Sequence, residues 1–281
     1  MKPRFIDIPD SWDELSPKQF EYLLKSIFLM MSNKKISTKD VLNDFADFLL
    51  GRSHPAHPLR REDYLSLVDK LAGHLAEWIF TDEEGAIKVD FCTTTNLLPK
   101  LGKLAGPVSH GSDLRFGEYR KAVEVYNLYT TTRNEMYLDM LVGMLYRPQN
   151  KMRKARNFNG DYKIPFNKFC MDIYRKNAKD IAPWLKWGVY LWFSYFCYYL
   201  MTGDFIIEGN TVNFSKIFGR STTDSDSKQS EGLGMTSILF SLADTGTFGN
   251  VEETDKALLF QVMMKLYHDK QQIDFLNKNK K

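Results

Sequence analysis

Two histidines in the segment HPAHP are the first residues of this chain whose types and spacing could do chemistry. His54 and His57 could point the same way and bind a metal ion. A zinc site needs three or four ligands, held in place by supporting hydrogen bonds. No further His or Cys lies nearby in the sequence, and the prolines around these histidines are typical of a helix end. We therefore expect no metal site here.

Nucleophilic or acid-base chemistry has no recognisable motif in the sequence. A catalytic Ser or Cys needs a sharp turn, a base and an orienting group, and the G-x-S-x-G motif that would supply the turn is absent. Cys170 and Cys197 lie in aromatic runs, where cysteine usually behaves as a small hydrophobic residue. The carboxylates at 82–84 and 252–255 are typical of a solvated helix end and of a helix N-terminus. We expect no catalytic residue and a protein that is not an enzyme.

One route to an enzyme stays open, because catalytic residues can converge from separate helices that a single sequence does not relate. A pocket that joins His110, the 113–115 loop and a remote carboxylate would indicate such a site. A nucleotide cofactor is not expected. The glycines from Gly102 to Gly111 lack the spacing of a phosphate-binding loop, and nothing else in the sequence suggests a cofactor.

A basic segment between residues 147 and 163 is the best candidate for binding nucleic acid. Its cations could neutralise phosphates while an aromatic side chain stacks on a base. The candidate residues are Arg147, Lys151, Arg153, Lys154, Arg156, Phe158 and Lys163. A formal charge of +3, from 38 basic and 35 acidic residues, gives the whole chain little attraction to nucleic acid or to an anionic membrane. Nucleic-acid binding is therefore the alternative function.

Composition indicates a globular protein that resides inside a cell. The 281 residues, 43% of them hydrophobic and 14% aromatic, can bury a substantial core without disulfides or metals. Three widely spaced cysteines favour a reducing compartment, and the N-terminus lacks the apolar segment of a secretory signal. The aromatic run 184–201 contains too many tyrosines for a membrane span. We expect it to be a buried helix inside the monomer, with a contact between subunits or with a membrane surface as the alternatives.

Periodicity predicts a mainly α fold, a multi-helix globular domain with small β-hairpin additions. Apolar residues spaced by three and four predict helices at 17–31, 38–49, 60–78, 116–147, 166–174, 184–201, 235–243 and 251–276. β-favouring runs predict an extended arm at 5–8, a strand at 86–91 and a hairpin near 205–214.

Domain organisation follows from the breaks between these elements. We expect an N-terminal helical region at 1–98, a glycine-rich loop at 99–117 and a C-terminal helical region at 118–281. The two regions are predicted to pack as one domain. The segment 220–232 has no large apolar residue and is predicted to be mobile.

Two stretches resemble proteins encoded near the tail genes of Bacteroidetes-type tailed phages and prophages. The opening IPDSWDELSPKQFEYLL has the Pro, Trp and Gln that mark the entry to a helical domain. The closing GLGMTSILFSLADTGTFGNVEETDKALLFQVMMKLYHDK has a short helix, a Phe-Gly turn and a long helix. The segment FGEYRKAVEVYNLYTTTRNEMYLDMLVGMLYRP extends the resemblance between them.

The resemblance implies a structural or chaperone-like assembly protein of a phage-like tail, without enzymatic activity, made alongside the tape measure. Its partners would be other tail or assembly proteins, including the tape measure, and further copies of itself. It would reside in the bacterial cytoplasm or in the virion. Trp12 and Phe248 are the predicted contact residues, with core packing as the alternative role of each.

Overall fold

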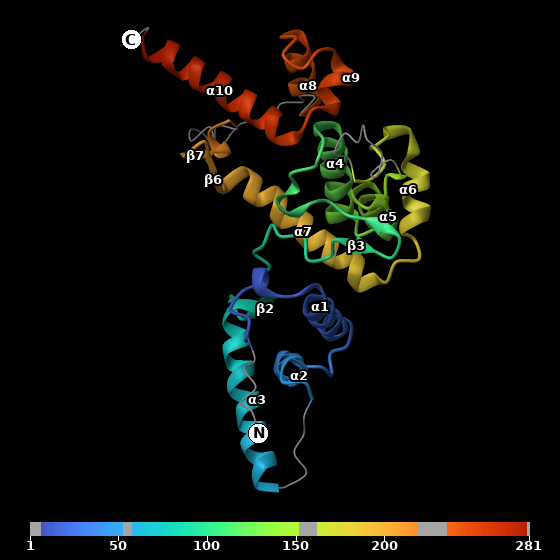
Figure 1. Ribbon diagram of the computed structural model, residues 1–281, viewed down its shortest axis with the longest axis vertical. Helices are drawn as coiled ribbons and strands as arrows, with labels where there is room; N and C mark the ends of the chain where they lie inside the picture. The colour runs from blue at the N-terminus through green and yellow to red at the C-terminus, as the bar shows by residue number, and fades with distance from the viewer. Residues whose placement is uncertain (1–6, 53–57, 152–161, 218–234, 280–281) are drawn as a thin grey trace. The chain divides into compact units, whose positions relative to one another are not determined.

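A computed structural model of the protein describes residues 7–52, 58–151, 162–217 and 235–279 (Figure 1). Within these ranges the chain forms ten α-helices and only small antiparallel strand pairs, so the predicted mainly α fold is confirmed. In the same ranges, no helix combines the length and the apolar composition that crossing a bilayer requires. The predicted mobile segment 220–232 lies outside the described residues, as do His54, His57 and residues 5 and 6 of the predicted arm at 5–8.

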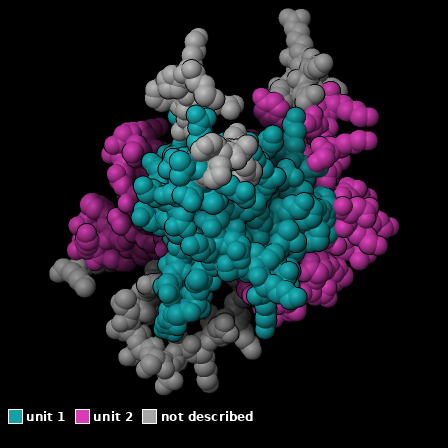
Figure 2. Space-filling view, turned by 90° about the horizontal axis from the view of Figure 1, so that it is seen from below, with its two compact units in different colours: residues 1–101, 181–195 teal, residues 102–180, 196–281 magenta. Residues whose placement is uncertain are grey.

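The chain divides into two compact units (Figure 2). Unit 1 contains residues 1–101 and 181–195, and unit 2 contains residues 102–180 and 196–281. The first boundary falls inside the predicted glycine-rich loop. The return of residues 181–195 to unit 1 was not predicted, because sequence periodicity does not report which helices pack together.

Unit 1 begins with two helices that start where their capping residues predict. Helix α1 spans Pro17–Ser32, and the Ser16 hydroxyl accepts a hydrogen bond from the Gln19 N–H at 3.3 Å while the Gln19 side chain accepts from the Ser16 N–H at 2.8 Å. Helix α2 spans Thr38–Leu49 and starts with the same reciprocal pattern between Ser37 and Asp40. Such capping boxes satisfy helix N–H groups that have no partner within the helix.

The remaining elements of unit 1 are a long helix, a hairpin and part of a second long helix. Helix α3 spans Pro58–Ile79 and packs against α2 (Figure 1). Strand β1, Phe80–Glu83, pairs with β2, Ala86–Val89. Strand β2 lies within the strand predicted at 86–91. Strand β3, Lys100–Leu101, ends the first part of the unit, and helix α7, Pro183–Thr202, contributes its residues up to 195.

Trp12 lies in the core of unit 1, in the 3-10 turn η1, Trp12–Glu14. Its side chain is 1% exposed, and its ring lies 5.4 Å from that of Trp78 and 5.1 Å from that of Phe91. The indole N–H donates to the carbonyl oxygen of Asp90 at 2.6 Å. Trp12 is therefore a core residue in this fold, which is the alternative role stated for it, and its ring presents almost no surface to a partner. Its predicted role as a partner contact stays a prediction.

In unit 2, the helix predicted at 116–147 is two helices. Helix α4 spans Phe116–Thr132 and α5 spans Glu135–Leu145. Arg133 between them has φ 55°, and the Asn134 side chain accepts a hydrogen bond from the Met136 N–H at 3.0 Å, which starts the second helix. Helix α5 packs against α4 and against α6, Met171–Ala178, which follows the 3-10 turn η4, Lys168–Cys170.

The predicted C-terminal helix is also divided. Helix α9 spans Val251–Lys256 and α10 spans Leu259–Lys278, preceded by α8, Met235–Asp244. Between α9 and α10 the backbone pairs with the segment before α4: the Phe116 N–H donates to the Ala257 oxygen at 2.9 Å, and the Leu259 N–H donates to the Leu114 oxygen at 2.8 Å. This long-range pairing takes hydrogen bonds that a continuous helix would use.

The smaller elements of unit 2 include the predicted hairpin. Strand β6, Asp204–Ile207, pairs antiparallel with β7, Asn210–Asn213, through a turn whose two central residues have positive φ. Strand β4, Leu104–Ala105, pairs with β5, Arg147–Pro148. The 3-10 turns are η2, Ser109–Gly111, and η5, Phe214–Lys216.

Candidate functional site

A cleft of about 1350 Å³ lies in unit 2, and we take it as the candidate functional site. Its walls come from α4, from residues 162–170 together with α6, from the start of α8 and from α9. The break between α9 and α10 helps to form the cleft. It leaves the end of α9 beside the start of α4, where both helices contribute to the cleft.

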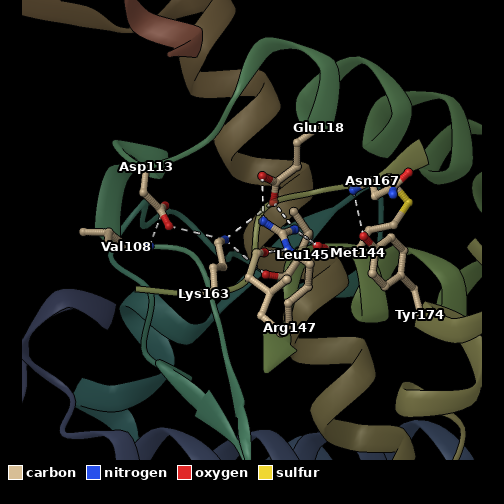
Figure 3. Close-up of polar contacts among 10 residues, drawn as sticks. Val108, Asp113, Glu118, Met144, Leu145, Arg147, Lys163, Asn167 and Tyr174 are labelled. Atoms are coloured by element: carbon tan, nitrogen blue, oxygen red, sulfur yellow. Dashed lines mark hydrogen bonds and ion pairs between the residues drawn. The ribbon is translucent and has the colours of Figure 1, made fainter. Parts of the chain in front are cut away.

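An ion pair between Arg147 and Glu118 is among the lining residues, and both side chains are almost fully buried, 3% and 0% exposed. Arg147 Nη1 lies 2.7 Å from Glu118 Oε1, and Nη2 lies 3.0 Å from Oε2 (Figure 3). The same guanidinium donates to the carbonyl oxygens of Met144 and, at 2.7 Å, Ile164. A two-point contact of this kind matches the fork of the guanidinium to the two carboxylate oxygens.

Lys163 joins this pair to a second carboxylate. Its Nζ lies 3.5 Å from Glu118 Oε1 and 3.3 Å from Asp113 Oδ2, and it donates to the Leu145 oxygen at 3.2 Å (Figure 3). The other oxygen of Asp113 accepts from the Val108 N–H at 2.8 Å. The network therefore contains two cations and two anions, and its formal charges cancel.

Short backbone pairings place both cations of the network. Strand β5 begins at Arg147, and the chain after it pairs with residues 162–164: the Asn150 N–H donates to the Tyr162 oxygen at 2.9 Å, and the Ile164 N–H donates to the Pro148 oxygen at 3.0 Å. Lys163 lies opposite Gln149 in this pairing. Both ends of the basic segment are thus tied together, and the first and last candidate cations point inward to Glu118 (Figure 3).

Electrostatics keep the Glu118 carboxyl ionised. Burial alone would raise its pKa, but the positive charges of Arg147 and Lys163 and their hydrogen bonds outweigh burial and hold the pKa below its ordinary value of 4.5. For Arg147, burial would lower the pKa, and the charge of Glu118 raises it above the ordinary value. Neither group titrates near neutral pH, so the pair is suited to holding structure and not to transferring protons.

A second ion pair joins α4 to α9. Arg120 Nη2 lies 2.8 Å from Asp255 Oδ1 and 3.1 Å from Oδ2, and Arg120 Nη1 donates to the Thr236 hydroxyl on α8 at 3.3 Å. The Arg115 guanidinium donates to the Lys256 carbonyl oxygen at 2.9 Å. These contacts hold the short helices α8 and α9 against α4.

Exposed apolar side chains line the cleft beside these ion pairs. Phe169 is 86% exposed and Ile173 is 56% exposed, and Tyr162 and Ile164 are also exposed. Large apolar side chains gathered in one exposed concavity mark an interaction surface more often than single exposed residues do. We name these four residues the apolar wall of the cleft.

The structure separates the predicted nucleic-acid residues. Arg147 and Lys163 are buried and bound to carboxylates, so neither presents its charge to a phosphate. Lys151 is exposed, and the other four candidates, Arg153, Lys154, Arg156 and Phe158, lie outside the described residues. Phe248 is half-buried in the turn after α8 and does not line the cleft. Its predicted contact role stays a prediction.

Some of the residues whose meeting in one pocket would indicate an enzyme do line the same cleft. Asp113 and Arg115 line the cleft together with the remote carboxylates Glu118 and Asp255, but His110 does not line it. Each of the three carboxylates is bound to a cation: Glu118 to Arg147, Asp113 to Lys163 and Asp255 to Arg120. These three carboxylates are therefore neutralised by cations of the same cleft.

The apolar wall was missed by sequence reasoning. Phe169 and Ile173 occur in the run KFCMDIY, for which the sequence predicts a helix at 166–174 but no interaction surface. Their spacing of four residues did indicate one helix face, but the sequence does not say whether that face is covered.

Neither a metal site nor a similarity to known proteins identifies a function for the cleft. Within residues 7–52, 58–151, 162–217 and 235–279, no group of three or more His, Cys, Asp or Glu side chains is arranged to hold a metal ion. No protein-family model, curated protein or solved structure matches this chain.

Proposed function

We propose that this protein is a structural or assembly protein of a phage-like tail that acts through protein–protein contacts and catalyses no reaction. The class of protein comes from the resemblance of residues 8–24 and 232–270 to proteins encoded near phage tail genes. Its partners would be other tail or assembly proteins, including the tape measure, met in the bacterial cytoplasm or in the virion.

The observation that carries the proposal is the apolar wall of the cleft. Phe169 and Ile173 leave most of their apolar surface in water, which costs free energy unless a partner covers it. The carboxylates Asp113, Glu118 and Asp255 of the cleft are each bound to a cation, so what the cleft offers beside them is apolar contact area.

Nucleic-acid binding by the 147–163 segment has less support. It was predicted from seven residues, and two of the cations, Arg147 and Lys163, are used inside the fold. Burial of both cations removes the two ends of the predicted phosphate-binding surface. Protein–protein contact is therefore the function that the geometry supports better.

A pull-down with matched variants tests the proposal. The tagged full chain is incubated with nuclease-treated lysate of its phage-bearing or prophage-bearing host at moderate salt, and the bound proteins are identified by mass spectrometry. We expect the wild-type chain to recover tail or tape-measure proteins and the double variant Phe169→Ala/Ile173→Ala to lose them. The variant Ile206→Ala is the control, because Ile206 is 82% exposed in the same unit but lies outside the cleft.

Two results would count against the proposal. One is recovery of tail proteins that is equal for the wild type and the double variant, which would remove the cleft from the interaction. The other is recovery that disappears on nuclease treatment, which would favour nucleic-acid binding.

A further inference from the structure

The charges that line the cleft are unbalanced in one direction. The buried network of Arg147, Lys163, Glu118 and Asp113 is neutral, and so is the pair of Arg120 and Asp255. The remaining charged side chains of the lining are four cations and two anions, namely Arg115, Lys121, Lys168 and Lys256 against Glu124 and Glu252. Counted formally over the described lining residues, the outer part of the cleft therefore has two more cations than anions.

One cation of this outer part, Lys168, lies next to the apolar wall, and the others line the same cleft. Lys168 is exposed and its Nζ lies 5.4 Å from the ring centroid of Phe169. Lys256 is exposed at the end of α9, and its carbonyl oxygen holds the Arg115 guanidinium. Lys121 is bound to Glu124 at 2.7 Å on α4. A ligand on the apolar wall would thus meet positive charge from the chain segment before α6 and from the end of α9.

The size of the cleft favours a polypeptide segment over a small molecule. Small-molecule sites usually have volumes of about 300–1,000 Å³, and this cleft is larger, at about 1350 Å³. Its apolar wall also contains two residues four positions apart, Phe169 and Ile173, which make an exposed stripe along η4 and α6. Grooves of this kind receive apolar side chains that recur every three or four residues of a partner helix.

We propose that the cleft of unit 2 binds an acidic amphipathic segment of a partner protein. Apolar side chains of that segment contact Phe169, Ile173 and Ile164, while its carboxylates lie near Lys168 and Lys256. The inference rests on the proposed function as a protein–protein contact, and it adds the chemistry of the partner. The apolar contacts supply affinity, and the cations on the edge supply the attraction that speeds association.

A single-stranded nucleic acid is the other ligand that cations beside aromatic rings can bind. The cleft fits it less well, because Ile164 and Ile173 offer no ring for a base to stack on and the positive excess is only two charges. Nucleic acid is therefore treated as a competing outcome of the experiment.

The experiment selects partners from a random library, so that no phage component is needed. Displayed random peptides of about 16 residues, roughly four helical turns, are selected on the folded full chain at moderate salt. Peptides that also bind the Phe169→Ala/Ile173→Ala variant are removed. We expect the enriched peptides to share a net negative charge and apolar residues spaced by three and four.

Binding kinetics of one enriched synthetic peptide then separate the two contributions. We expect Phe169→Ala to weaken affinity by about tenfold, mainly through faster dissociation. We expect Lys168→Glu/Lys256→Glu to slow association by about tenfold at low salt, with a smaller effect at high salt. Lys216→Glu is the matched control, because Lys216 is exposed in the same unit outside the cleft. Circular dichroism confirms that each variant is folded.

Three outcomes would overturn the inference. The first is a selection that yields no peptide dependent on Phe169 and Ile173. The second is an enriched set that is neutral or basic. The third is that a labelled single-stranded DNA displaces the peptide from the wild-type chain and does not bind the Lys168→Glu/Lys256→Glu variant. Each of these leaves the tail-protein pull-down unaffected, and a failed pull-down leaves the peptide selection valid, so the two failures can be told apart.

Discussion

Arg147 and Glu118 form a two-point ion pair in the interior of unit 2, with N–O distances of 2.7 and 3.0 Å. The pair connects α4 to β5, and Lys163 extends it to the chain that returns after the basic segment. A buried charge is tolerated only when its partners compensate for the lost water. The stability of this part of unit 2 therefore depends on keeping all the charges of the network together.

The first prediction removes the shared anion. Glu118→Gln leaves Arg147 and Lys163 buried without their common carboxylate, and breaking a buried pair in this way costs about 3–5 kcal/mol in the free energy of unfolding. Glu124→Gln on the same helix is the control. Glu124 is exposed and forms a surface ion pair with Lys121, so its loss should cost less than about 1 kcal/mol. Urea unfolding followed by circular dichroism measures both, and equal losses would show that the buried network contributes no more than a surface pair.

The second prediction concerns acid. The pKa of Glu118 in the folded protein lies below the ordinary value of 4.5. Between the lowered pKa of Glu118 in the folded protein and its ordinary pKa in the unfolded chain, the unfolded chain binds more protons than the folded one. The free energy of unfolding therefore rises with pH in that interval. The contribution of Glu118 is complete above about pH 4.5 and is lost as the pH falls through the lowered pKa of the folded protein. Above that range Glu118 adds no pH dependence.

The measurement is the free energy of unfolding of the wild type and of Glu118→Gln, from pH 7 down to pH 3. The difference between the two proteins should be constant from pH 7 to about 5 and should shrink below pH 4.5. A difference that stays constant to pH 3 would contradict a lowered pKa of Glu118.

Sequence reasoning predicted the elements whose causes are local. Helix α1 starts at Pro17 because Ser16 and Gln19 satisfy each other's backbone N–H groups, and the two residues are only three positions apart in the sequence. The β6–β7 hairpin likewise depends on a short turn that contains Gly209. Such features need no knowledge of the rest of the fold.

The helix breaks show where local reasoning ends. The interruption at Ala257 comes from hydrogen bonds to residues 114–116, more than a hundred positions earlier, which no local pattern reports. The interruption at Arg133 had a local signal that was overlooked: Asn134 before Glu135 is a good helix start. Only the second break could have been predicted.

The candidate site was beyond the sequence for a related reason. Arg147 and Lys163 were interpreted as exposed cations because charged residues are usually solvated. Their burial depends on Glu118, which lies on helix α4, 29 positions before Arg147. The apolar wall could not be predicted for the opposite reason: Phe169 has the sequence pattern of a core residue, but in the structure it is exposed.

The third prediction separates folding from binding at Trp12. Trp12→Ala removes a ring that contacts Phe20, Trp78 and Phe91 in the core, and such truncations cost about 3–5 kcal/mol in the free energy of unfolding. Capture of tail proteins by the folded variant should equal that of the wild type when both are compared below the unfolding transition. A variant that keeps its stability but loses capture would support Trp12 as a contact residue.

The fourth prediction compares two glycines that lie inside helices. A Cβ at Gly143 on α5 would lie 2.0 Å from the backbone oxygen of Tyr174, while a Cβ at Gly73 on α3 would meet nothing within 4 Å. Alanine stabilises a helix interior by about 0.5–1 kcal/mol relative to glycine when space is available. Gly73→Ala should therefore raise the free energy of unfolding by about this amount.

Gly143→Ala should have the opposite sign. The clash is with backbone, so α5 and α6 must separate, and overpacking of this kind costs about 1–3 kcal/mol. Chemical unfolding of the two single variants and the wild type gives both values under identical conditions. If Gly143→Ala were as stabilising as Gly73→Ala, the close approach of α5 to α6 would be wrong. The apolar wall would then lose its support, because α6 carries Ile173, the residue before Tyr174, and follows the turn that carries Phe169.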